Sequence, residues 1–80
     1  MITVQVRLFA TLRRYYPDLG IGEAMPIELP EGATVKDLLE ELDLPGEQVM
    51  VVFVSGVTRD RDHPLKDGDE VGIFPPVGGG

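Results

Sequence analysis

The sequence predicts a single small α+β domain in which one main helix packs on one face of an open sheet. Three patterns support this prediction. Residues 2–8 alternate apolar with polar side chains, as a half-buried strand does. Residues 35–42 carry valine and leucine at helical spacing, and residues 50–54 form a continuous apolar run. Because a helix stripe and a sheet face bury each other, a chain of 80 residues satisfies all three patterns with one core.

The first part of the chain is expected to form a strand and a short helical segment. The strand at residues 2–8 has one buried face, formed by Ile2, Val4, Val6 and Leu8. Residues 9–16 change to a helical period, with Phe9, Leu12 and Tyr16 on one side. We therefore expect a short helix or helical turn after the first strand.

A second strand and the main helix follow. Residues 24–29 are expected to form an edge strand, because Pro26 cannot donate to a hydrogen-bond ladder. Thr34 is a good N-cap, and Asp37 three residues later completes a variant of the capping box. The apolar positions then recur at i, i+3, i+4 and i+7, namely Val35, Leu38, Leu39 and Leu42. The helix is expected to end at residues 44–46, where leucine, proline and glycine follow one another.

The second half of the chain predicts further strands. The run at residues 50–54 is apolar throughout, which indicates an interior strand covered, at least in part, on both faces. Ser-Gly at residues 55–56 turns the chain into a short strand at residues 57–58. An Asp-Gly turn then leads to the final strand at residues 71–74.

Composition limits the classes of function. Fourteen acidic against seven basic side chains give a formal net charge of −7, which repels nucleic acid and anionic membranes and favours basic partners or simple solubility. The absence of cysteine excludes disulfides and thiolate metal sites and suits a reducing cytosol. The start of the sequence offers no uninterrupted apolar block for a signal peptide or membrane span. We therefore expect a cytoplasmic protein with no nucleic-acid or membrane partner.

No pattern of catalytic or metal-ligating residues emerges from the sequence. His63 is the single histidine and has no cysteine with which to share a metal ion. Asp60 and Asp62 alternate as in a calcium loop, but the next ligand position falls on Pro64 and the loop glycine is missing. We therefore expect no metal site in this chain.

The end of the sequence is its most informative stretch. Phe74 closes the last expected strand and is followed by Pro75, Pro76, Val77, Gly78, Gly79 and Gly80. Prolines favour an extended backbone, and glycines pass through channels too narrow for side chains. We divide the chain into a domain, residues 1–74, and an extended tail, residues 75–80, which spans about 20 Å and can enter a partner's active site. Glycine-rich ends also occur without function, but the preceding strand and proline pair favour a functional tail.

Three stretches carry a resemblance to a known family. Residues 64–71 read Pro-Leu-Lys-Asp-Gly-Asp-Glu-Val, residues 74–80 read Phe-Pro-Pro-Val-Gly-Gly-Gly, and residues 6–13 read Val-Arg-Leu-Phe-Ala-Thr-Leu-Arg. Together with the element order they resemble the MoaD/ThiS family of ubiquitin-like sulfur carriers over essentially the whole chain. The Pro-Pro-Val segment resembles the MoaD branch, the small subunit of molybdopterin synthase. The resemblance implies a β-grasp fold, with a mixed sheet of four to five strands and the main helix on one face.

The chemistry of this family implies a role for the tail. The family's terminal Gly-Gly falls on Gly79 and Gly80, and a terminal carboxylate, with a pKa of roughly 3.3 to 3.7, is ionised and needs activation. The resemblance implies that an E1-like enzyme adenylates Gly80 with ATP and Mg²⁺, and that sulfur from a persulfide donor then replaces AMP. The thiocarboxylate enters a large synthase subunit of MoaE type and donates its sulfur to a pterin precursor. The partner-binding tail comprises Phe74, Pro75, Pro76, Val77, Gly78 and Gly79, and no cofactor is bound by this chain.

Alternatives remain open at this point. A carrier of the same kind also fits thiamin thiazole, cysteine, tRNA thiolation or tungsten-cofactor synthesis, because the partner selects the acceptor. A ubiquitin-like protein modifier uses the same activated Gly80 to form an isopeptide with a target lysine. A passive β-grasp binding module with an idle tail is a third class. Phe74 either anchors the tail, contacts the partner or belongs to the core.

Overall fold

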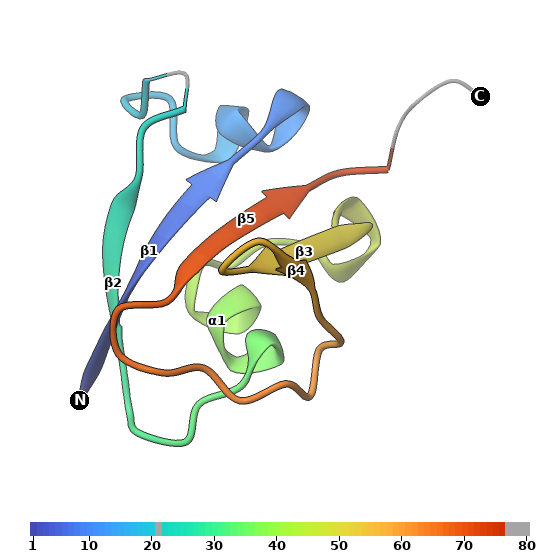
Figure 1. The fold of residues 1–80 in the computed structure, drawn as a ribbon. Coiled ribbons are helices and arrows are strands. Elements are labelled where there is room, and N and C mark those ends of the chain that lie inside the picture. The colour runs from blue at the N-terminus through green and yellow to red at the C-terminus, as the bar shows by residue number, and fades with distance from the viewer. Residues whose placement is uncertain (21, 77–80) are drawn as a thin grey trace.

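The computed structural model describes residues 1–20 and 22–76 (Figure 1). In these residues five strands form one sheet in the order β2-β1-β5-β3-β4, and α1 covers one face of it. The central strands β1 (Ile2–Leu8) and β5 (Glu70–Phe74) run parallel. The other three strands pair antiparallel with their neighbours: β2 (Met25–Leu29), β3 (Val51–Val54) and β4 (Val57–Thr58). The expected mixed sheet with one main helix is confirmed.

β1 follows the alternation that the sequence predicts. Its even-numbered side chains, Ile2, Val4, Val6 and Leu8, are buried on the side of α1. The register with β5 sets Val6 beside Val71 and Leu8 beside Ile73, so the buried rows of the two central strands are continuous. The odd-numbered side chains of β1 lie on the opposite face, which we call the open face.

The expected helical turn after β1 is the 3₁₀ helix η1 (Ala10–Tyr15), but Phe9 does not belong to it. Leu12 is buried in the core, and the hydroxyl of Tyr16 donates a hydrogen bond to the carbonyl oxygen of Leu42 at 2.8 Å. Phe9 has an extended backbone, with φ −117° and ψ 153°, and continues the outward row of β1. The prediction that Phe9 shares a helical face with Leu12 and Tyr16 is wrong, because the alternation of β1 extends one residue further.

The edge position of β2 and the start of α1 (Val35–Glu41) agree with the prediction. β2 is the first strand in the sheet order, so Pro26 lies at an edge. At the helix start, the Thr34 side chain accepts a hydrogen bond from the Asp37 N–H, and the Asp37 carboxylate accepts one from the Thr34 N–H at 2.9 Å. This reciprocal capping box satisfies two backbone groups that a helix start otherwise leaves unpaired.

α1 ends earlier than the sequence suggests. Asp43 adopts φ +58°, and its N–H donates to the carbonyl of Glu40. The Leu44 N–H donates to the carbonyl of Leu39, which completes a Schellman motif. The expected end at residues 44–46 is therefore too late, and those residues lead into a second 3₁₀ helix, η2 (Gly46–Gln48), that was not foreseen. Within the described ranges, no helix is long and apolar enough to span a bilayer.

β3 and β4 form a tight hairpin at the end of the sheet order. Ser55 and Gly56 both have positive φ, +49° and +87°, as a type I′ turn requires. β3 lies between β5 and β4, as expected for an interior strand. Only one of its faces is fully covered, because Val51 and Phe53 on the open face are half-buried.

The stretch at residues 64–71 sets the parallel register of β5 with β1. The Asp67 carboxylate accepts a hydrogen bond from the Thr3 N–H at 2.8 Å, and the Gly68 N–H donates to the Thr3 carbonyl at 2.8 Å. The Gln5 N–H then donates to the Asp69 carbonyl at 2.9 Å, immediately before β5 begins. This stretch therefore has a structural role: it aligns the strand that leads to the tail.

Candidate functional site at the root of the tail

β5 delivers the start of the tail to one end of the open face. Phe74, its last residue, pairs in register with Val51, and the Phe74 carbonyl accepts a hydrogen bond from the Met50 N–H at 2.8 Å. Pro75 is buried and Pro76 is exposed, so the chain becomes exposed at the second proline. The remaining predicted tail residues lie outside the described residues, namely Val77, Gly78, Gly79 and Gly80.

Three phenylalanines form an aromatic cluster beside this root. The rings of Phe9 and Phe74 stack, with centroids 4.3 Å apart and planes within 1°. The ring of Phe53 meets Phe74 edge-on, with centroids 5.4 Å apart. All three are half-buried and lie outside the core cluster. Phe74 therefore belongs to the open face and not to the core.

Gly72 allows the ring of Phe9 to lie across β5. The two residues come from neighbouring strands, since Gly72 pairs in register with Arg7, two residues before Phe9. A Cβ atom at Gly72 would stand 3.2 Å from Cε2 of Phe9, which is closer than carbon atoms normally pack. The missing side chain thus leaves room for the stacked pair.

An apolar hollow of about 400 Å³ separates the cluster from η1 and includes the two prolines of the tail. We call it the root groove, and its lining residues are Ala10, Thr11, Met50, Val51, Phe53, Phe74, Pro75 and Pro76. Met50 is 63% exposed there, although it is a large apolar side chain. Apolar side chains gathered around an exposed groove mark sites of protein contact. The root groove is therefore the candidate docking surface.

Polar side chains border the other side of the cluster. Arg7 Nη1 lies 3.0 Å from Glu70 Oε1, and Arg7 Nε donates to the carbonyl of Gly22 at 3.1 Å. Both side chains of the ion pair are exposed, so the pair contributes at most about 1 kcal/mol to stability. Arg7 and Glu70 line a hollow together with the three phenylalanines, so the ion pair lies next to the apolar cluster.

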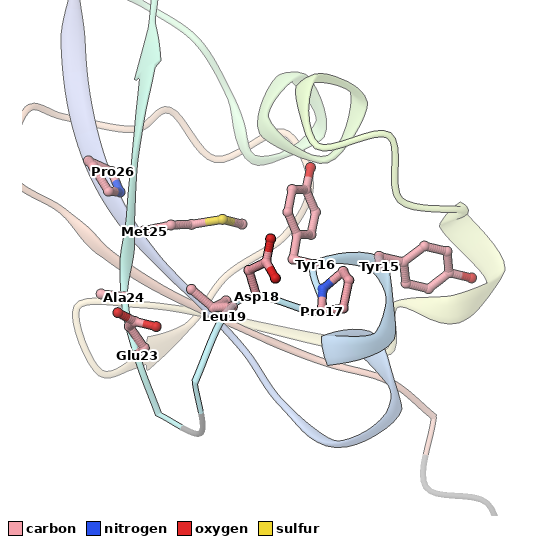
Figure 2. Close-up of a pocket in the computed structure, with 9 residues that line it drawn as sticks. All are labelled: Tyr15, Tyr16, Pro17, Asp18, Leu19, Glu23, Ala24, Met25 and Pro26. Atoms are coloured by element: carbon pink, nitrogen blue, oxygen red, sulfur yellow. The ribbon is translucent and has the colours of Figure 1, made fainter.

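A separate hollow of about 430 Å³ lies between the η1 end and β2 (Figure 2). Figure 2 shows Tyr16 pointing toward α1, where its hydroxyl donates to Leu42. Partial burial, and then the carboxylates of Asp43 and Glu41, raise the pKa of the Tyr16 hydroxyl above its ordinary value. Since this hydroxyl is already engaged in holding η1 to α1, we assign the hollow a structural role.

The structure brings together only part of what the sequence singled out. Phe74, Pro75 and Pro76 meet at the root groove, as a tail root should. His63 belongs to the loop before β5, where its carbonyl accepts from the Val35 N–H. Among the described residues, no group of three or more histidine, aspartate or glutamate side chains is arranged to hold a metal ion.

Sequence reasoning missed three members of the site. Phe9 is expected on a helix, and Met50 and Phe53 are expected in a strand covered, at least in part, on both faces. If the alternation of β1 is continued one residue past Leu8, Phe9 falls on the same face as Arg7, and this would have identified Phe9 as a residue of the open face. The half-burial of Phe53 depends on which face of β3 is covered by α1, whereas Met50 is exposed because it precedes β3 and does not share its alternation. The run of apolar residues carries no sign of either feature.

Comparison with known proteins identifies the family of the chain. The family model described as "ThiS family" matches residues 6–80. The "Molybdopterin synthase sulfur carrier subunit" of Chlamydomonas reinhardtii is 34% identical over 85 residues, covering 96% of this chain and 98% of that protein. A threonine–tRNA ligase of Protochlamydia amoebophila is 40% identical over 45 residues, but the match spans 55% of this chain and 7% of the ligase.

Solved structures show the same fold over the full chain. The putative molybdopterin converting factor subunit 1 from Pyrococcus furiosus has a TM-score of 0.77 and 37% identity, covering 96% of this chain and all of that one. Subunit 1 in the complex with subunit 2 of the Helicobacter pylori molybdopterin-converting factor has a TM-score of 0.64, 26% identity and coverage of 99% and 100%. Small archaeal modifier protein 1 of Methanosarcina acetivorans has a TM-score of 0.70, 28% identity and coverage of 100% and 98%.

The sheet, the helix on one face and these matches define a ubiquitin-like β-grasp domain of the sulfur-carrier class. The chain belongs to the ThiS family. The resemblance to MoaD/ThiS carriers, and to the MoaD branch among them, is confirmed.

Proposed function

We propose that this protein carries sulfur as a thiocarboxylate on Gly80 and donates it in molybdopterin biosynthesis, as the small subunit of a synthase. The observation that carries the proposal is the nearly end-to-end match with the sulfur carrier subunit of C. reinhardtii. The family match also extends through the glycine tail, to residue 80. A tail aligned together with its domain is what a carrier of this kind requires.

The chemistry of the proposal needs an activating partner. The Gly80 carboxylate, as the terminal group of the functional chain, is ionised and resists attack by sulfur. An E1-like enzyme using ATP and Mg²⁺ converts it to an acyl-adenylate. The outer sulfur of a persulfide donor then attacks the acyl carbon and AMP leaves, which gives an acyl disulfide. A thiol reductant cleaves the S–S bond of this acyl disulfide, is itself oxidised to a disulfide, and leaves the thiocarboxylate on Gly80. The carrier itself contributes no catalytic group to these steps. Its part is to present the tail and to dock.

The root groove and the aromatic cluster supply the docking surface in this proposal. Met50, Phe53 and Phe74 lie beside Pro75 and Pro76, so a partner that binds this surface receives the tail at the same time. The complex of subunits 1 and 2 in H. pylori supports a large synthase subunit as one such partner. The E1-like enzyme needs the same tail, and we propose that it docks on the same surface.

Reconstitution tests the proposed function. The protein is incubated with its E1-like enzyme, ATP, Mg²⁺, a persulfide donor and a thiol reductant, and its intact mass is measured. We expect one oxygen of Gly80 to be exchanged for sulfur. When the large synthase subunit and a pterin precursor are then added, we expect the sulfur to pass to the precursor. A variant lacking Gly80 is the matched control, and we expect it to fold normally and to acquire no sulfur. Unchanged mass of the full chain with an active E1-like enzyme would rule the carrier role out.

A protein modifier is the second candidate function. It is favoured by the full-length likeness to small archaeal modifier protein 1 of M. acetivorans. A modifier passes the activated Gly80 to a lysine of another protein instead of to sulfur. It would appear in cell extract as a series of higher-mass conjugates that all contain Gly80 in an isopeptide bond. A carrier forms the thiocarboxylate without such a series.

A further inference from the structure

The two lysines of the chain lie together at one end of the molecule. Of the seven basic residues, only Lys36 and Lys66 carry primary amines on their side chains, and the other five are arginines. The Lys36 N–H donates to the Arg61 carbonyl at 2.8 Å, and Lys66 follows on the same loop as Arg61, before the turn into β5. Both lysines therefore lie on or beside the loop between β4 and β5, and both side chains are exposed.

The tail leaves from the opposite end of the sheet. β5 runs away from this loop, and the red segment after it in Figure 1 lies at the far end of the strand. The chain from Asp69 to Pro76 spans about 23 Å if extended. The four residues beyond Pro76 reach at most about 14 Å, so the tail would have to double back fully stretched to approach Lys66.

The cations on the 3₁₀ helix beside the tail root are arginines. η1, whose Ala10 and Thr11 line the root groove, also carries Arg13 and Arg14. A guanidinium group stays protonated and does not act as a nucleophile, whereas the amine of a lysine loses its proton readily and does. An acyl-adenylate or thioester held near such an amine would be captured as an amide.

We propose that this domain keeps its lysine amines out of reach of the activated tail, so that the acyl carbon of Gly80 survives until the partner's sulfur attacks it. The inference rests on the proposed activation of Gly80. The reaction that is avoided is a cyclisation: a lysine Nζ attacks the Gly80 carbonyl carbon, a C–N bond forms, the C–O or C–S bond to the leaving group breaks, and the amine proton passes to solvent. The lysine positions thus protect the acyl carbon from the rest of the chain.

The test uses a chemically activated tail and needs no E1-like enzyme. The full chain is fused to an intein and released with a small thiol, which leaves Gly80 as a thioester. Two variants receive the same substitution at opposite ends: Thr11→Lys beside Pro75 and Pro76, and Thr3→Lys beside the turn at Asp67. Each thioester is followed by intact mass at low protein concentration and mildly alkaline pH, after circular dichroism has confirmed the fold.

We expect the Thr11→Lys thioester to cyclise to a product one water lighter than the hydrolysed chain, with a rate of loss about tenfold or more above wild type, because a reachable amine acts at millimolar effective concentration. Wild type and Thr3→Lys should be lost by hydrolysis alone, at equal rates. Proteolysis and peptide mass then locate the amide that joins the substituted side chain at position 11 to Gly80 in the Thr11→Lys product. Cyclisation of wild type or Thr3→Lys, or its absence in Thr11→Lys, would overturn the inference. Because the thioester is made without an activating enzyme, failure here is distinct from failure of the proposed sulfur transfer.

Discussion

Replacing Phe74 by alanine separates the role of the open face from that of the core. Phe74 and its neighbour Ile73 point to opposite faces of β5, and Ile73 is fully buried whereas Phe74 is half-buried. Half-burial of a phenylalanine contributes about 1 kcal/mol, and its two ring contacts add about 1 kcal/mol together. Phe74→Ala should therefore cost about 2 kcal/mol of unfolding free energy.

Ile73→Ala should cost more, although it removes the smaller side chain. Truncating a fully buried isoleucine leaves a cavity and costs about 2 to 5 kcal/mol, and we expect about 3.5 kcal/mol here. Urea unfolding measures the loss of unfolding free energy for Phe74→Ala and for Ile73→Ala, provided that the m-value is the same as that of wild type. The free energy of unfolding of a domain of this size is roughly 4 to 12 kcal/mol, so Ile73→Ala could leave part of the protein unfolded. Ile73→Val costs about 1 kcal/mol and therefore serves as the folded control in the binding measurement.

The binding measurement completes the test. Phe74→Ala should weaken the complex with the E1-like enzyme or the large synthase subunit at least about tenfold, since it removes the centre of the aromatic cluster. Ile73→Val should bind as wild type does. A loss of stability larger for Phe74→Ala than for Ile73→Ala, or unchanged partner affinity of Phe74→Ala, would refute the assignment of Phe74 to an open docking face.

Three further substitutions test the local structure that positions the tail. Thr34→Ala removes the capping box and should cost about 1 kcal/mol in urea unfolding, whereas Lys36→Ala on the exposed side of the same turn should be nearly neutral. Tyr16→Phe loses the hydrogen bond to Leu42 and should cost about 1 kcal/mol at neutral pH. Because the pKa of the Tyr16 hydroxyl is raised in the folded state, the stabilisation by this group is present below a pH of about 10 and is lost as the pH rises through the folded-state pKa. The unfolding free energy of Tyr16→Phe should not show this fall. An identical pH profile for wild type and Tyr16→Phe would contradict the account. Asp43→Gly relieves a positive φ at the helix end and should raise stability by about 1 kcal/mol, whereas a loss would show that the Asp43 side chain stabilises the native state.

The regular part of the fold could be predicted because each element follows one period. The alternation of apolar and polar residues predicted β1. Helical spacing predicted α1, through Val35, Leu38, Leu39 and Leu42, and the capping pair Thr34 and Asp37 predicted the residue where this helix begins. The end of α1 was missed because Asp43 adopts a left-handed conformation that glycine usually takes, and the nearby Pro45 and Gly46 gave a stronger but later signal.

The site was predicted in part for a related reason. Phe74, Pro75 and Pro76 follow one another in the chain, so their proximity is a property of the sequence. Phe9 and Phe53 join them only because β5 lies between β1 and β3, and no local pattern encodes that order. Tertiary pairing thus decides which apolar residues remain on the open face.

The mass of the C-terminal peptide in protein isolated from its own cell tests the central claim most directly. The peptide is released by proteolysis under conditions that preserve thioacids and is read by tandem mass spectrometry. We predict a fraction of the peptide that ends at Gly80 and carries one sulfur in place of one oxygen at that residue. A peptide that continues beyond Gly80 in the functional protein, or one that ends there with the unmodified carboxylate even while the E1-like enzyme and sulfur donor are active, would contradict a carrier role.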